Sequence, residues 1–111
     1  MSDLTPQMIF EENIAKRLAG NPDIAAKINA TYQFELSGEG GGSWIVDLKK
    51  PSDWVSAGTS ESPTVTIMMT AADFVALVSG KLNGQMAFMT GKLKLKGDVG
   101  LALKLQQILG T

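Results

Sequence analysis

The sequence contains neither cysteine nor histidine among its 111 residues. Without cysteine the chain cannot form disulfides, thiolate nucleophiles or zinc–thiolate sites. Without histidine it lacks the commonest general base and metal ligand near neutral pH. No Ser-His or Cys-His pair exists, and no two carboxylates are spaced to act as acid and base on one bond. We therefore expect no catalytic residues, no metal site and no cofactor.

Long apolar runs and targeting signals are also missing. No stretch approaches the roughly eighteen apolar residues that a membrane span needs. The first residues, MSDLTPQ, do not combine a basic region with an apolar one, so they do not resemble a secretory signal. The final LGT matches no retention or peroxisomal signal. We expect a cytoplasmic protein.

The composition is typical of one globular domain, and we expect that domain to span residues 1–111. The chain is 44% apolar and 19% charged, and its mean hydropathy is +0.08. A net charge of −1 does not indicate a nucleic-acid partner. The C-terminal third is nevertheless basic, because after Phe74 one carboxylate, Asp98, stands against Lys81, Lys92, Lys94, Lys96 and Lys104.

The N-terminal quarter shows helical periodicity. Residues 5–20 begin with Thr-Pro and end with Gly, which are start and stop signals of a helix. Its apolar face would carry Phe10, Ile14 and Leu18. A second Asn-Pro start predicts a short helix over residues 22–28.

The pattern then changes to a period of two, which indicates strands. We predict strands over residues 30–36 and 44–49, around 54–55, and over 64–69. The first would place Ala30, Tyr32, Phe34 and Leu36 on one face. The glycine-rich loop between the first two strands is followed by a strand and not a helix, so it predicts a hairpin connection and not a phosphate-binding loop.

The C-terminal half returns to helices. Thr70 is a predicted N-cap for a helix that ends at Gly80, and another short helix fits between Asn83 and Gly91. A strand over 92–96 would turn Leu93 and Leu95 inward, and a final helix over 98–109 would begin at Asp98. This order predicts an α+β domain with helices on one sheet face.

The chain holds more apolar residues near its end than a core of this size obviously needs. Met86, Phe88 and Met89 are close together, and the final helix is apolar on nearly all sides. Methionine is flexible and suits a space that accepts several shapes. Two explanations stay open: the surplus forms a dimer interface, or it lines a space for an apolar ligand.

Alternating lysines mark the last predicted strand. Lys92, Lys94 and Lys96 share one side of it. Such lysines can form a solvated edge that discourages strand aggregation. The alternative is a docking surface for anionic membrane lipid, where each lysine contributes about 1 kcal/mol.

Several motifs resemble the sterol carrier protein type 2 domain family. They are an opening helix with F..I..RL, the strand WIVDLK, and the string FVALVSGKLNGQMAFMTGKLKLKGDVGLALKLQQIL. These motifs keep the family's order and spacing over about residues 8–109. The resemblance implies a five-stranded mixed sheet covered on one face by about five helices, with an apolar tunnel between the two layers.

The resemblance also implies which residues contact a ligand. By position, the tunnel wall would comprise Trp44, Val46, Phe74, Leu77, Val78, Leu82, Met86, Met89, Leu101, Leu105 and Ile108. Gln85 matches a position where a polar side chain meets a ligand oxygen.

The function implied is that of an intracellular lipid carrier without catalytic residues. Its ligands would be fatty acids, fatty acyl-CoA, phospholipids or sterols, which it transfers or presents to membranes or enzymes. The alternative is a non-catalytic interaction module that dimerises, or docks to an enzyme of fatty-acid metabolism, through its apolar surface. We expect a monomer or weak dimer.

Overall fold

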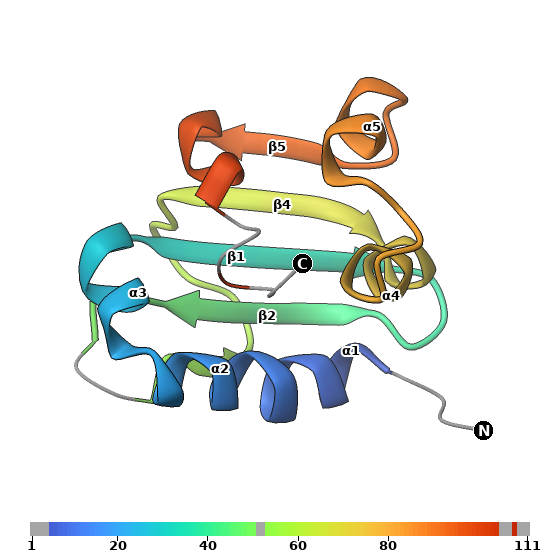
Figure 1. The fold of residues 1–111 in the computed structure, drawn as a ribbon. Helices are drawn as coiled ribbons and strands as arrows, with labels where there is room; N and C mark the ends of the chain where they lie inside the picture. Colours follow the sequence, from blue (N-terminus) through green and yellow to red (C-terminus); the bar gives the residue numbers. More distant parts are fainter. Residues whose placement is uncertain (1–4, 51–52, 105–107, 109–111) are drawn as a thin grey trace.

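The protein is described by a computed structural model, which covers residues 5–50, 53–104 and 108. Five strands form one mixed sheet in the order β3-β2-β1-β4-β5. Figure 1 shows most of the helices in front of this sheet. The predicted α+β class, with five strands and helices over one face, is confirmed.

The N-terminal helix is continuous from Pro6 to Gly20 but changes its winding twice. It comprises α1 (Pro6–Met8), a π-helical segment η1 (Ile9–Ile14) and α2 (Ala15–Gly20). Ile9 and Ile14 are five residues apart, the π repeat, and both are buried. The predicted face of Phe10, Ile14 and Leu18 is buried as well. The second helix, α3 (Pro22–Ile28), follows as expected.

The central strands are β1 (Thr31–Ser37), β2 (Gly42–Asp47), β3 (Val55–Ala57) and β4 (Val65–Thr70). β1 runs antiparallel to β2 and parallel to β4, while β3 pairs with β2 and forms one edge. Alternation along β1 buries Tyr32, Phe34 and Leu36 against the helices, as predicted.

Two polar residues on the opposite face of β1, Thr31 and Gln33, are buried too. Gln33 is 2% exposed, because the connection from β3 to β4 crosses the sheet over it. Its Nε2 donates to the carbonyl of Gly58 at 3.1 Å, and its Oε1 accepts from the N–H of Ser60 at 2.6 Å. Gln33 thus fixes the crossover that makes β4 parallel to β1.

The C-terminal half contains α4 (Ala71–Val78), α5 (Gly84–Met89) and the edge strand β5 (Lys94–Gly97), antiparallel to β4. The predicted cap of α4 is confirmed, since the Thr70 hydroxyl accepts from the N–H of Asp73 at 3.1 Å. At α5, the Asn83 side chain accepts from Gln85 and Met86 N–H groups at 2.9 and 3.1 Å. Leu93 is buried and Leu95 half-buried, facing inward as expected.

The prediction of an α-helix over residues 98–109 is wrong for the first part of that range. The chain there forms a 3₁₀ helix, η2 (Val99–Lys104). The N–H of Leu101 bonds the carbonyl of Asp98 at 3.2 Å, the i+3 spacing of a 3₁₀ turn, and Gly100 disfavours an α-helix. Asp98 caps this turn by accepting from the N–H of Gly100 at 3.0 Å. Residues 105–107 and 109–111 lie outside the described residues.

Candidate functional site

The predicted ligand-contacting residues show a graded exposure. Four are buried: Val46, Phe74, Leu77 and Ile108. Four are half-buried: Trp44, Val78, Leu82 and Leu101. Three on α5 are exposed: Gln85, Met86 and Met89. Leu105 lies outside the described residues. The role of these residues in binding stays a prediction.

The buried end of the predicted site is an aromatic cluster. The Phe10 ring stacks on Trp44 and on Phe74, each with centroids 5.0 Å apart and an interplanar angle of 11°. Phe34 meets the Phe10 ring edge-on, with a centroid distance of 5.0 Å. Phe10 was expected only as part of an apolar helix face. The structure shows that it joins the first helical segment to β1, β2 and α4.

The half-buried residues extend along the β4–β5 side of the sheet, from α4 at the Thr70 end of β4 to η2 at its Val65 end. Val78 ends α4, Leu95 is on β5, and Leu101 is on η2; all three pack against the buried core while keeping some exposure. Leu95 was predicted to point inward but was not assigned to the site. Its period-two spacing from Leu93 was the signal that could have assigned it.

Helix α5 is attached to this region by its backbone and one small side chain. The Ala87 carbonyl accepts from the N–H groups of Lys92 and Leu93 at 2.8 and 3.0 Å. Ala87 is also the buried residue of α5, whereas Met86, Phe88 and Met89 are 57%, 51% and 73% exposed. The helix therefore turns its large apolar side chains toward solvent.

Tyr32 connects the sheet to η2. Its hydroxyl donates to the carbonyl of Leu101 at 2.5 Å. Burial of the phenol raises its pKa above the ordinary range, and the negative charge of nearby Asp98 raises the pKa further. Tyr32 consequently stays a neutral hydrogen-bond donor and holds η2 against the sheet through Leu101.

We expect Tyr32→Phe to cost about 1 kcal/mol of unfolding free energy at neutral pH, because the Leu101 carbonyl loses its donor. The wild-type protein should also lose stability as the pH rises above about 10, where the unfolded tyrosine ionises but the folded one keeps its proton. Tyr32→Phe should lack that part of the loss. Urea unfolding at several pH values measures both effects.

Tyr32 is the single tyrosine of the chain, so tyrosinate absorbance reports its ionisation alone. A folded protein whose tyrosine titrates at the ordinary pKa would contradict this account.

Two residues of the predicted lysine stripe, Lys94 and Lys96, lie on the face of the sheet opposite the helices, and Lys92 precedes β5. Lys92, Lys94 and Lys96 are all exposed. In the ladder, Lys94 pairs with Met68 and Lys96 with Thr66, on the edge strand β5. The geometry fits both explanations of the stripe, and membrane docking stays a prediction.

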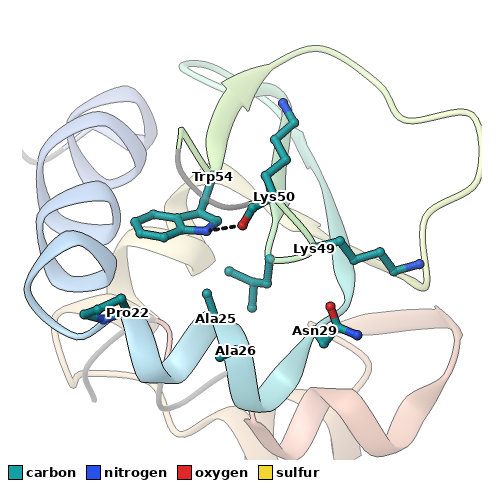
Figure 2. A pocket seen from close by; sticks show the side chains of 8 residues that line it. Pro22, Ala25, Ala26, Asn29, Lys49, Lys50 and Trp54 are labelled. Carbon is teal, nitrogen blue, oxygen red and sulfur yellow. Dashed lines mark hydrogen bonds between the residues drawn. The ribbon is translucent and has the colours of Figure 1, made fainter.

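A pocket that was not predicted lies at the other end of the sheet, between α3 and the β2–β3 connection (Figure 2). It has a volume of about 280 Å³. The indole Nε1 of Trp54 donates to the carbonyl of Lys50 at 2.8 Å, which fixes the ring at the pocket wall. Figure 2 shows the Lys49 and Lys50 side chains extending away from Trp54 and Ala25. The pocket is smaller than most small-molecule sites, so we do not assign a long lipid to it.

Comparison with known proteins identifies the family. The model of the SCP-2 sterol transfer family matches residues 11–110. The chain belongs to the SCP-2 sterol transfer family. The resemblance seen in the sequence is therefore confirmed over nearly the whole chain.

Two solved SCP-2 structures share the fold. Sterol carrier protein 2 from Yarrowia lipolytica, in its apo form, is 35% identical, with a TM-score of 0.72 over 93% of this chain and 84% of that one. Sterol carrier protein 2 like 2 from Aedes aegypti, in its palmitated form, is 30% identical, with a TM-score of 0.77 over 97% of this chain and 96% of that one.

Longer proteins also contain a similar segment. Hydroxysteroid dehydrogenase-like protein 2 from Bos taurus is 48% identical over 88 residues, which are 78% of this chain and 21% of the relative. The chain thus spans about a fifth of the length of the curated relatives it matches. Among the described residues, none of the helices has the length and apolar character needed to traverse a bilayer.

Proposed function

We propose that this SCP-2 domain binds a lipid with a long acyl chain between its helices and the β4–β5 side of the sheet. The observation that carries the proposal is the graded exposure around α4, α5 and η2. Val78, Leu82 and Leu101 are apolar and half-buried where they pack against the fully buried core. The palmitated Aedes aegypti relative, which shares the fold, supports an acyl chain as the ligand.

Burial of methylene groups would supply the affinity. Transfer of each CH₂ from water is worth about 0.8 kcal/mol, so about a dozen buried methylenes give roughly 10 kcal/mol. Part of this is offset by the loss of translational and rotational freedom, about 4 kcal/mol or more. The free energy gained by burial scales with the buried apolar area and depends little on the shape of the lipid. Fatty acids, fatty acyl-CoA, phospholipids and sterols are therefore all candidate ligands, and fatty acids come first.

The polar end of the lipid would lie at α5. Gln85 is exposed there next to Met86 and Met89, which would line the mouth. For a fatty acyl-CoA, Lys92, just beyond α5, can meet the phosphates as a point charge. In this proposal the domain is a carrier without catalytic residues, and its cytoplasmic location stays a prediction.

Titration with a fluorescent fatty acid tests the proposal. One equivalent should bind saturably, and palmitate should displace it. Absence of saturable binding by the folded protein would contradict the proposed function.

We expect Lys92→Glu with Lys94→Glu to slow transfer of that fatty acid to anionic vesicles about tenfold or more. Each lysine near such a surface contributes about 1 kcal/mol, and reversal replaces attraction by repulsion. Affinity for the fatty acid should not change. Transfer is measured from fluorescence after mixing with phosphatidylcholine–phosphatidylserine vesicles.

Lys49→Glu with Lys50→Glu is the matched control, because these lysines are also adjacent and exposed but lie at the other end of the sheet. Equal transfer rates for the two double variants would contradict membrane docking by the lysine stripe and favour its explanation as a solvated edge.

A second candidate role is presentation of lipid to an enzyme. The similar segment in hydroxysteroid dehydrogenase-like protein 2 is about a fifth of that protein, which favours a module that works beside another domain. In that case the exposed side chains of α5 would contact the partner. Light scattering of the chain, alone and with such a partner, separates this role from free transport.

A further inference from the structure

Helix α5 presents an apolar surface on its solvent side. The large apolar side chains described as exposed are Met8 at 41% and three residues of α5, namely Met86, Phe88 and Met89. Consecutive helical residues are rotated by about 100°, which places Ala87 opposite the middle of the arc that Met86, Phe88 and Met89 occupy. Burial of Ala87 therefore fixes the other three outward. Soluble monomers rarely expose such a cluster without a partner for it.

The charged residues nearest α5 in the sequence, on both sides, are lysines. Residues 74–97 carry Lys81, Lys92, Lys94 and Lys96 and no carboxylate. Lys81 and Lys92 are exposed and flank α5 in the chain, on either side of it. Among the described residues, none of these lysines forms an ion pair. By strand register the nearest carboxylate on the sheet is Glu35, two strands from Lys94 and hence about 10 Å away.

Apolar side chains bordered by unpaired lysines are complementary to the surface of an anionic bilayer. An anionic bilayer offers negative headgroups to the lysines and acyl chains to the apolar side chains. We propose that α5 docks the protein on anionic membranes by inserting Phe88 and its methionine neighbours below the headgroups, with Lys81 and Lys92 at the lipid phosphates. Figure 1 shows α5 projecting beyond the end of β5, away from α2 and α3, so that no other labelled helix blocks its approach.

This docking rests on the proposed function in one respect: lipid binding explains why the mouth of the lipid site should be brought to the membrane. Vesicle binding is measured on the full chain with and without fatty acid. Fatty-acid affinity is measured without vesicles. Phe88 and Lys81 lie outside the predicted lipid-contacting set, so failure of docking and failure of lipid binding give different results.

Phe88→Gln should weaken partition onto vesicles of equal phosphatidylcholine and phosphatidylserine about tenfold, through loss of inserted apolar area. Lys81→Gln should weaken it about fivefold, and only when phosphatidylserine is present. The controls are Met8→Gln, an exposed apolar residue of α1, and Lys27→Gln, an exposed lysine of α3. Both should stay within about twofold of wild type, since neither side chain would touch the bilayer.

Insertion itself is tested by labelling. The chain has no cysteine, so Phe88→Cys and Met8→Cys each accept one nitrobenzoxadiazole label without competition. The label at 88 should shift its emission to the blue on anionic vesicles, and the label at 8 should not. Unchanged partition of Phe88→Gln, or no shift at 88, would overturn the proposal. So would a dimer in light scattering that Phe88→Gln dissociates, because a second copy would then cover α5.

Discussion

Val78→Trp should lower the affinity for a long-chain fatty acid at least about tenfold. Val78 is half-buried at the end of α4, at the rim of the proposed site. The larger indole would occupy space proposed for the lipid, and exclusion of only two methylenes costs about 1.6 kcal/mol. The same titration with a fluorescent fatty acid measures the change.

Val55→Trp is the matched control. Val55 is also a half-buried valine, but it lies on β3, at the opposite edge of the sheet from β5. It should bind like wild type. Circular dichroism and thermal unfolding establish that both variants fold. Wild-type affinity in a folded Val78→Trp, and likewise in Leu101→Trp, would place the ligand elsewhere.

Phe10→Ala should cost about 3 to 5 kcal/mol of unfolding free energy, a large part of the stability of a small domain. Phe10 is fully buried and contacts the rings of Trp44, Phe74 and Phe34. Its removal leaves a cavity and breaks these aromatic pairs. Urea unfolding followed by tryptophan emission measures the loss, and Trp44 reports directly on the altered cluster.

Met8→Ala is the control within the same helical run, and its cost should be below about 1 kcal/mol because Met8 is partly exposed. If Phe10→Ala does not fold, Phe10→Leu provides the measurement, with an expected loss of about 1 to 2 kcal/mol. A loss in Phe10→Ala no larger than that in Met8→Ala would contradict the central place given to this ring.

Local signals were sufficient where one residue acts on its own neighbours. The cap at Thr70 was predicted from the sequence, because its hydroxyl reaches a backbone N–H only three residues away. The short helix at Asn83 follows the same rule, and the period-two pattern of β1 reflects its one buried face. These elements depend little on the rest of the fold.

Features that join distant segments were not predictable from pattern. The strand pattern predicts an exposed side chain at Gln33, but the β3–β4 crossover covers it. Both the Nε2 and the Oε1 of its amide form hydrogen bonds to the crossover. The π-helical winding of η1 likewise serves to bury Ile9 and Ile14 together in the core. The resemblance implied a five-stranded mixed sheet, but the strand order with β4 beside β1 was not predicted, because periodicity does not encode which strands pair.

The candidate site was predicted as a set of apolar residues with one polar contact, Gln85. The family resemblance placed Met86 and Met89 in the tunnel wall with Phe74 and Leu77, because a matched position does not show how exposed its side chain is. The structure puts the first two at the surface and the last two in the core. That difference depends on which face of α5 packs on the core through Ala87, and the local pattern does not encode this.

An NMR titration of the ¹⁵N-labelled chain with palmitate would report both whether a lipid binds and where it binds. The account predicts saturation at one equivalent, with amide shifts at the end of α4, along α5 and in η2, including those of Val78 and Leu101. Shifts confined to the pocket beside Trp54, or no saturable shifts at all, would contradict it.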